Sequence, residues 1–142
     1  MMRAALAIAL AATVAGCSYQ PESGTSAQSG GAAGDKTYFV SEIAPVLQTA
    51  CVTCHLTGEE AGNISLLPRN AIAMTVDVPS IEAPEVLRVA PGKPDESYLV
   101  MKLEGTHIAG GGSGSHMPFG GAPLPPETIA KFRTWIEKGA KP

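Results

Sequence analysis

The amino-acid sequence predicts an all-α fold for one small domain, residues 37–142. Apolar residues recur at helical spacing in several short segments, and these segments are separated by turns rich in Gly and Pro. No segment alternates convincingly between apolar and polar residues with period two, as a half-buried strand would. Aromatic residues make up only 5% of the 142-residue chain, so we expect a thin core for a domain of this size.

The first helical pattern lies just before residue 51. Its apolar positions are Phe39, Ile43, Val46 and Leu47. Pro45 suits the first turn of the second part of this segment, where a missing N–H costs nothing. A polar loop is expected over residues 56–63, and a short helix is expected near residues 70–74.

The second half of the domain begins with a turn at residues 89–94. Pro94 and the two acidic residues after it open the next helix, because negative charge is favourable at a helix N-terminus. The apolar side of that helix is expected to contain Tyr98, Leu99, Met101 and Leu103. A Gly-rich loop covers residues 105–121. The last helix is expected to begin at Pro126 and to stop at Gly139. Its expected buried side chains are Ile129, Phe132, Trp135 and Ile136.

The most specific chemistry in the chain belongs to the run Cys51-Val52-Thr53-Cys54-His55. Cys-x-x-Cys-His is the pattern for covalent attachment of a c-type haem. Two thiols three positions apart fall on the same side of one helical turn, so both can form thioethers to one edge of the porphyrin. His55 is then placed to supply the proximal iron ligand. We therefore expect one covalent haem c, whose apolar area would also enlarge the core.

Three other interpretations of this run are disfavoured. A zinc site needs about four ligands, yet Cys54 and His55 are neighbours whose side chains diverge, and no second ligand pair follows. A thioredoxin-like dithiol would start a helix within a βαβ pattern, whereas these cysteines follow a helical segment. A disulfide between cysteines three apart would close too small a loop to stabilise the fold much.

The N-terminus, residues 1–16, has the pattern of an export signal. Arg3 precedes an apolar run from Ala4 to Val14 that is too short to span a bilayer comfortably. The run ends in Val14-Ala15-Gly16-Cys17, which resembles the lipobox of bacterial lipoproteins. The resemblance implies cleavage before Cys17 and lipidation of Cys17, with an ordinary export signal as the alternative. Ser18 would direct the lipoprotein to the outer membrane, facing the periplasm, in a Gram-negative host.

Residues 17–36 are rich in Ser, Gly, Ala, Thr and Gln and are expected to form a flexible tether. The three cysteines of the chain are then all assigned, one to lipid and two to haem, which leaves none for a disulfide. Residues 37–142 contain eleven Asp and Glu against eight Lys and Arg. The absence of a basic stripe argues against a nucleic-acid partner.

The second axial iron ligand has five candidates. They are Met74, Met101, Met117, His107 and His116. Met74 and Met101 lie in expected helices, where packing explains them. Met117 lies in a loop rich in Gly and Pro, where a flexible apolar side chain has little packing reason to exist, so we favour Met117 as the distal ligand. Either later histidine, another methionine or an open position remains as an alternative.

The region from about Tyr38 to Ala140 resembles a class I c-type cytochrome domain. The matching segments are residues 43–47, the motif 51–55, residues 89–94 with Ser97-Tyr98-Leu99, Met117-Pro118, and residues 129–140 with Trp135-Ile136. The resemblance implies short helices wrapped around one haem, with the first and last helices crossing. It also implies that Met117 is the distal ligand.

Histidine and methionine in the two axial positions would leave the iron able only to exchange electrons. Its reduction potential would be higher than that of a haem with two histidine ligands. We therefore expect a membrane-anchored electron carrier that meets other redox proteins transiently outside the cytoplasm. One alternative is a haem enzyme or gas sensor with an open or labile sixth position, which a flexible loop at residues 110–115 would permit. Another is a redox subunit of a larger oxidase or dehydrogenase. The oligomeric state is left open.

Overall fold

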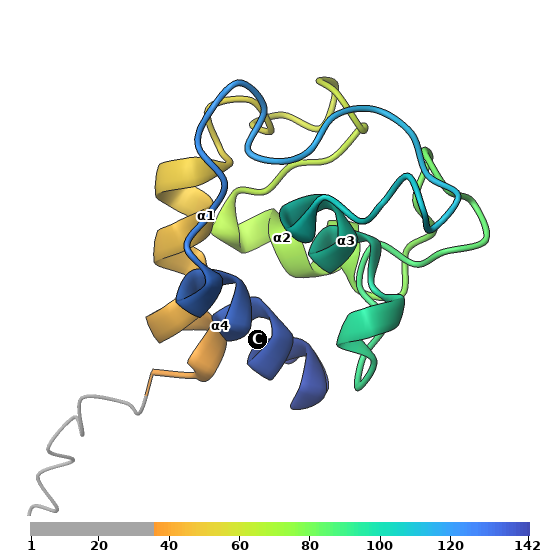
Figure 1. Ribbon diagram of the computed structural model, residues 1–142. Coiled ribbons are helices and arrows are strands. Elements are labelled where there is room, and N and C mark those ends of the chain that lie inside the picture. Colours follow the sequence, from red (N-terminus) through yellow and green to blue (C-terminus); the bar gives the residue numbers. More distant parts are fainter. Residues whose placement is uncertain (1–35) are drawn as a thin grey trace, which may run out of the picture. The chain divides into compact units, whose positions relative to one another are not determined.

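The structure is a computed structural model that describes residues 36–142. Within this range the chain forms four α-helices, a π-helical turn and a 3₁₀ turn, and it contains no strand (Figure 1). In chain order these are η1 (Phe39–Ile43), α1 (Ala44–Ala50), α2 (Pro68–Thr75), η2 (Pro94–Glu96), α3 (Tyr98–Glu104) and α4 (Pro126–Glu137). The all-α prediction is therefore confirmed for the described residues.

The first helical segment, η1 followed directly by α1, lies where the apolar spacing predicts it. Pro45 stands in the first turn of α1, as expected. Phe39, Ile43 and Leu47 are buried, whereas Val46 is only partly buried. The spacing of four residues between the buried positions places them on one face of the segment.

That face packs against α4, the last helix (Figure 1). The ring centroids of Phe39 and Trp135 lie 5.4 Å apart at an interplanar angle of 45°. The indole Nε1 of Trp135 donates a hydrogen bond of 2.8 Å to the carbonyl oxygen of Lys141, beyond the end of α4. The first and last helical segments thus meet through a pair of aromatic rings.

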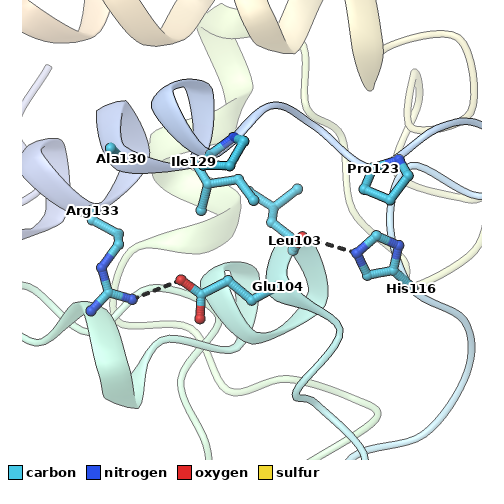
Figure 2. A pocket seen from close by; sticks show the side chains of 8 residues that line it. Leu103, Glu104, His116, Pro123, Ile129, Ala130 and Arg133 are labelled. Atoms are coloured by element: carbon cyan, nitrogen blue, oxygen red, sulfur yellow. Dashed lines mark hydrogen bonds and ion pairs between the residues drawn. The ribbon is translucent and has the colours of Figure 1, made fainter.

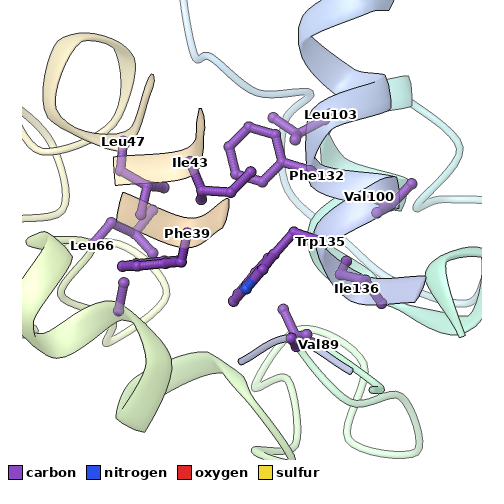
Figure 3. Packing of buried hydrophobic residues seen from close by; sticks show 12 residues of the cluster. Phe39, Ile43, Leu47, Leu66, Val89, Val100, Leu103, Phe132, Trp135 and Ile136 are labelled. Atoms are coloured by element: carbon purple, nitrogen blue, oxygen red, sulfur yellow. The ribbon is translucent and has the colours of Figure 1, made fainter. Parts of the chain in front are cut away.

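One hydrophobic cluster joins η1 and the four α-helices (Figure 3). We call it the core cluster; its buried members are Phe39, Ile43, Leu47, Leu66, Ala71, Val89, Val100, Leu103, Phe132, Trp135, Ile136 and Ala140. Three of the four side chains predicted to be buried on α4 belong to it. The fourth, Ile129, is only partly buried and packs against the cluster edge.

The helix predicted from Pro94 onward is divided in two, so that prediction needs correction. Residues 94–96 form η2, and α3 begins only at Tyr98. Ser97 between them is extended, and its Oγ accepts a 2.9 Å hydrogen bond from the Ala90 N–H and donates one of 2.9 Å to the Lys93 carbonyl. These bonds tie Ser97 back to the preceding turn and interrupt the helix.

The apolar side of α3 also differs from the prediction. Val100 and Leu103 are its deeply buried aliphatic residues, with Tyr98, whereas Leu99 and Met101 are only partly buried. Lys102 is buried as well, with only 6% of its surface exposed. Helical spacing thus predicted Tyr98 and Leu103 correctly but missed Val100 and the burial of Lys102.

Of the segment between α2 and η2, only the turn that begins at residue 89 was predicted from the sequence. It folds back on itself through two isolated bridges, Val76 with Val89 and Pro79 with Leu87. The guanidinium of Arg88, which is almost buried, donates to the carbonyl oxygens of Met74 at 2.8 Å and Gly62 at 2.9 Å. Arg88 therefore ties the loop after the cysteine motif to the end of α2.

Candidate functional site

The Cys-x-x-Cys-His run forms one tight turn directly after α1. The Cys51 N–H donates to the Leu47 carbonyl at 3.0 Å, which continues the helical pattern by one residue. The Cys51 carbonyl then accepts hydrogen bonds from the N–H groups of Cys54 at 3.2 Å and His55 at 3.1 Å. These bonds hold the two thiol-bearing residues and the histidine within a single turn of chain.

The two thiols have different surroundings. Cys51 is partly buried and packs against the core cluster, whereas Cys54 is exposed, and neither forms a disulfide. Burial raises the pKa of the Cys51 thiol to about 11. Because a thiolate is the form that binds zinc or attacks a disulfide, this apolar setting favours an uncharged sulfur, either a thiol or a thioether.

The His55 side chain lies at the boundary between interior and solvent. Partial burial lowers its pKa from the ordinary value of 6.5, so the imidazole is neutral at pH 7. Its Nδ1 is buried without a hydrogen-bond partner. An unpaired buried nitrogen is costly, and a bound group beside the ring that orders or ligates the imidazole would offset that cost.

The backbone around His55 is fixed from the following loop. The Leu66 N–H donates to the His55 carbonyl at 2.8 Å, and the Ser65 hydroxyl donates to the Leu56 carbonyl at 2.7 Å. Residues 56–63 contain no helix, as the sequence predicts. The turn that carries the motif is therefore anchored on one side by α1 and on the other by the chain that enters α2.

Metal-site geometry of the zinc type is not present in the part of the chain that the structure describes. No three His, Cys, Asp or Glu side chains among residues 36–142 converge on a point that could hold a metal ion. The zinc interpretation of the motif thus gains no support from these residues.

Met117 lies in the loop between α3 and α4. Its N–H donates to the Lys102 carbonyl at 3.0 Å, which ties this point of the loop to α3. Its side chain is partly buried and packs against the core cluster, which Cys51 also contacts. The structure therefore brings Cys51 and Met117 to the same hydrophobic cluster, although they are 66 residues apart in sequence.

The two later histidines are engaged elsewhere. Nε2 of His107 lies 3.1 Å from the Gly114 carbonyl, and Nε2 of His116 lies 2.9 Å from the Leu103 carbonyl. A carbonyl oxygen only accepts, so both Nε2 atoms carry the proton and donate. His107 is moreover only 3% exposed, so protein atoms already cover its ring. Neither Nε2 offers a lone pair to a metal, whereas Nδ1 of His107, like Nδ1 of His55, is buried without a hydrogen-bond partner.

The other two methionines also have local roles. The Sδ atom of Met74 accepts a 3.2 Å hydrogen bond from the Ser65 N–H. The Sδ atom of Met101 lies so close to Gly110 that a Cβ there would come within 2.9 Å of it. Both contacts agree with the expectation that these residues fill space, which leaves Met117 as the favoured thioether ligand.

An open cavity of about 410 Å³ lies between the end of α3 and the start of α4 (Figure 2). Leu103, Ile129 and Pro123 give it apolar walls, while His116 and the paired side chains Glu104 and Arg133 lie at its edge. Its lining includes none of Cys51, Cys54, His55 and Met117. It is therefore not a site that those four residues build.

The predicted export signal, the lipidation site Cys17 and the tether up to residue 35 lie outside the described residues. Among residues 36–142 no helix has the length and apolar character needed to cross a membrane.

Compared with models of protein families, with curated proteins and with solved structures, the chain shows no significant match. Any function must therefore be argued from the residues themselves.

Proposed function

We propose that this chain is a membrane-anchored monohaem c-type cytochrome that carries single electrons between redox proteins on the extracytoplasmic side of the bacterial cell envelope. The observation that carries the proposal is the turn after α1, where two free thiols and a neutral imidazole share one hydrogen-bonded turn. Cys-x-x-Cys-His is the pattern that attaches haem c.

The donor set fits such a group. Cys51 and Cys54 would form the two thioethers, and His55 would hold one axial position of the iron. Conversion of the Cys51 thiol to a thioether keeps the sulfur uncharged, which suits the apolar contacts that raise the pKa of this thiol. When bound, the haem supplies a one-electron couple, and this chain's own residues determine its ligands, its exposure and its surroundings.

Met117 would hold the other axial position. Met74, His107 and His116 each make a hydrogen bond of their own, and the sulfur of Met101 lies against Gly110. The sulfur of Met117 makes no hydrogen bond within residues 36–142, and its side chain packs against the core cluster from a loop. A thioether ligand favours reduced iron and raises the potential relative to two imidazoles. With both axial positions filled, the iron would have no free position for a small molecule and would only exchange electrons.

The remaining parts of the proposal concern architecture and place in the cell. The helical fold, with η1 and α4 packed together, is compatible with a class I cytochrome fold. Lipidation at Cys17 would anchor the chain, with residues 17–36 as a tether that raises the local concentration near membrane partners. Encounters with those redox partners would be transient, through small interfaces.

The test is the mass and colour of the full chain produced in a bacterium that attaches haem to exported proteins. We expect the purified protein to exceed the mass of the processed polypeptide by one haem, and the haem to remain attached under denaturing conditions. Cys51→Ser with Cys54→Ser should abolish covalent haem, because both thioethers are lost.

Cys17→Ser is the matched control, since it removes the third cysteine and leaves the motif intact. It should retain the covalent haem. A wild-type protein that is colourless and has the mass of the bare polypeptide would contradict the proposed function.

A further inference from the structure

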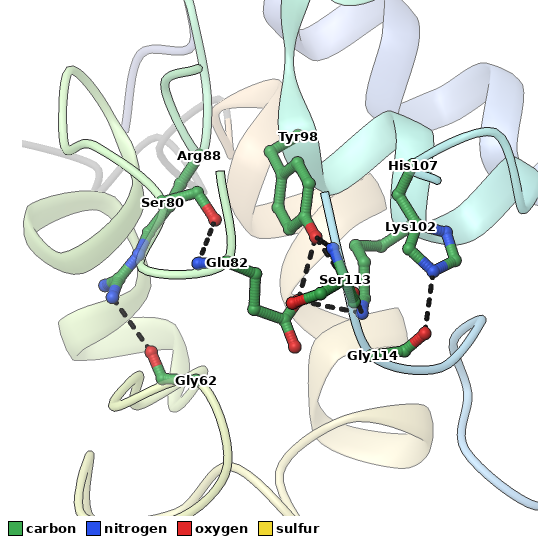
Figure 4. A network of polar contacts seen from close by, with 9 residues as sticks. All are labelled: Gly62, Ser80, Glu82, Arg88, Tyr98, Lys102, His107, Ser113 and Gly114. Carbon is green, nitrogen blue, oxygen red and sulfur yellow. Dashed lines mark hydrogen bonds and ion pairs between the residues drawn. The ribbon is translucent and has the colours of Figure 1, made fainter. Parts of the chain in front are cut away.

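A cluster of polar side chains lies under the Gly-rich loop that carries Met117 (Figure 4). Lys102 Nζ lies 2.8 Å from Glu82 Oε2, and the Tyr98 hydroxyl lies 2.9 Å from the same oxygen. We call Glu82, Tyr98 and Lys102 the polar clamp. Two of its members come from α3 and the third from the segment between α2 and η2, so the contact is long-range.

Two of the three members of the polar clamp are buried. Lys102 and Tyr98 are 6% and 5% exposed, and the side chain of Glu82 is 29% exposed. Burial alone would raise the pKa of the Glu82 carboxyl, but the hydrogen bonds from Lys102 and Tyr98 outweigh it, and the pKa is lowered. The Glu82 carboxylate is therefore charged at neutral pH, and loss of Lys102 would leave it without its ion-pair partner.

The polar clamp forms hydrogen bonds to the loop backbone at Ser113. Lys102 Nζ donates to the Ser113 carbonyl at 3.1 Å, and the Ser113 N–H donates to the Tyr98 oxygen at 3.2 Å. Because a hydroxyl has one proton, Tyr98 can donate to Glu82 while it accepts from Ser113. His107 adds a further bond to the next residue, from Nε2 to the Gly114 carbonyl.

The glycines of this loop allow close contact with the clamp. A Cβ at Gly112 would collide with the Tyr98 hydroxyl, and a Cβ at Gly114 would collide with Glu82 Oε1. Gly114 also has a positive φ of 76°, which other residues rarely adopt. The high glycine content here therefore serves close backbone approach, which argues against the flexible loop that the sequence analysis considered at residues 110–115.

The same lysine also holds the far end of the segment. The Met117 N–H donates to the Lys102 carbonyl at 3.0 Å, and His116 Nε2 donates to the Leu103 carbonyl at 2.9 Å. Lys102 thus holds Ser113 with its side chain and Met117 with its backbone. Residues 113–117 therefore have little freedom to move away from α3.

We propose that Lys102, supported by Glu82 and Tyr98, is a positioning residue that fixes residues 113–117 and so determines how firmly Met117 keeps its axial place. The identity of the group that Met117 holds rests on the proposed function. The immobilisation of residues 113–117 by the clamp does not, because it follows from contacts within this chain.

The experiment compares Lys102→Met and Tyr98→Phe with Lys93→Met in the full chain. Lys93→Met is the matched control, because Lys93 also forms an ion pair, with Glu96, but both partners are exposed. The first measurement is amide hydrogen exchange at residues 113–117. We expect Lys102→Met to speed this exchange by roughly tenfold or more, since hydrogen bonds to charged groups are lost, and the control to leave it unchanged.

The second measurement, on protein that carries haem, is the rate at which carbon monoxide binds the ferrous form. We expect Lys102→Met to bind carbon monoxide faster, because release of Met117 limits access to the iron. We also expect the far-red absorption of the sulfur-to-iron bond to weaken in the ferric form. Tyr98→Phe removes only a hydroxyl, so it keeps the proposal testable should Lys102→Met not fold, and it should show the same changes to a smaller extent.

Unchanged exchange at residues 113–117 in both variants would overturn the clamp. Faster exchange with an unaltered carbon monoxide rate would overturn the link to Met117. Absence of covalent haem in the wild type would instead reject the proposed function, and the exchange measurement would still decide whether the clamp exists.

Discussion

At the scale of single residues, the clearest distinction is among three methionines. Met74 accepts a hydrogen bond from Ser65, and Met101 lies against Gly110, whereas Met117 lies in the loop segment that the polar clamp holds. Side-chain type alone does not separate them, because thioether chemistry is identical in all three. The surroundings of each sulfur make the difference.

This distinction gives a prediction for Met117→Ala in protein that carries haem. We expect loss of the sulfur-to-iron absorption in the ferric form and rapid carbon monoxide binding in the ferrous form, because the sixth position would open. The reduction potential should fall, since a thioether ligand favours reduced iron. Visible and far-red spectra with a redox titration would measure all three.

Met101→Ala is the control for that experiment. It removes the same side chain from α3 and should destabilise the fold moderately, but the absorption band and the potential should remain. If Met101→Ala removed the band and Met117→Ala kept it, our assignment of the axial ligand would be wrong.

The two cysteines of the motif also differ in their surroundings. Cys51 and Cys54 are equivalent in the sequence pattern, yet one is packed against the core cluster and the other is exposed. Burial raises the pKa of the Cys51 thiol. An apolar setting that keeps sulfur uncharged agrees better with a thioether than with a metal-bound thiolate.

At the scale of elements, the contact between η1 and α4 links the two ends of the domain. Phe39 and Trp135 meet there, and the indole of Trp135 also holds the chain end through the Lys141 carbonyl. One aromatic side chain therefore supports both the crossing of two helical segments and the turn after α4.

A graded pair of substitutions tests this role. Trp135→Ala should lower the free energy of unfolding by about 3–5 kcal/mol, because a large buried ring leaves a cavity. Trp135→Phe keeps a ring, so it should cost less, mainly the hydrogen bond to Lys141 at about 0.5–1.5 kcal/mol. Denaturant unfolding followed by circular dichroism measures both.

Lys131→Gln serves as the comparison for the same pair of elements. Lys131 bridges α4 to Glu42 of η1 at 2.9 Å, but both side chains are more than a third exposed. Its loss should change the free energy of unfolding far less than Trp135→Ala does, because solvent screens an exposed ion pair. Equal effects for Lys131→Gln and Trp135→Ala would contradict the importance that we give to the aromatic contact.

At the scale of the whole molecule, the chain combines a compact helical unit with an N-terminal region whose proposed role is export and anchoring. We predict that Cys17→Ser releases the protein from membranes, because the lipid that would bind it is lost. Fractionation of cells that express the full chain, with detection of the protein in soluble and membrane fractions, measures this.

Cys54→Ser is the control for localisation, since it also removes one cysteine but leaves Cys17 in place. It should remain in the membrane fraction. A wild-type protein found wholly in the soluble fraction would rule out the anchor without affecting the proposed haem site.

By itself, the sequence determined the helical class, the approximate place of all four α-helices and the motif turn at residues 51–55. These features depend on local information: apolar spacing, proline at a first turn, glycine after a last one, and a short ligand pattern. The crossing of the first and last helical segments was also predicted, through a resemblance, and the contact of Phe39 with Trp135 agrees with it.

Only the tertiary structure decided the break at Ser97, the bridges between residues 76 and 89, and the burial of Lys102. Each depends on partners far away in sequence, such as Glu82 for Lys102, and local periodicity contains no information about them. The Gly-rich loop also depends on distant partners. From the sequence alone, the glycines at 112 and 114 indicate a flexible loop. In the folded chain they are the positions where side chains of α3 and Glu82 leave no room for a Cβ.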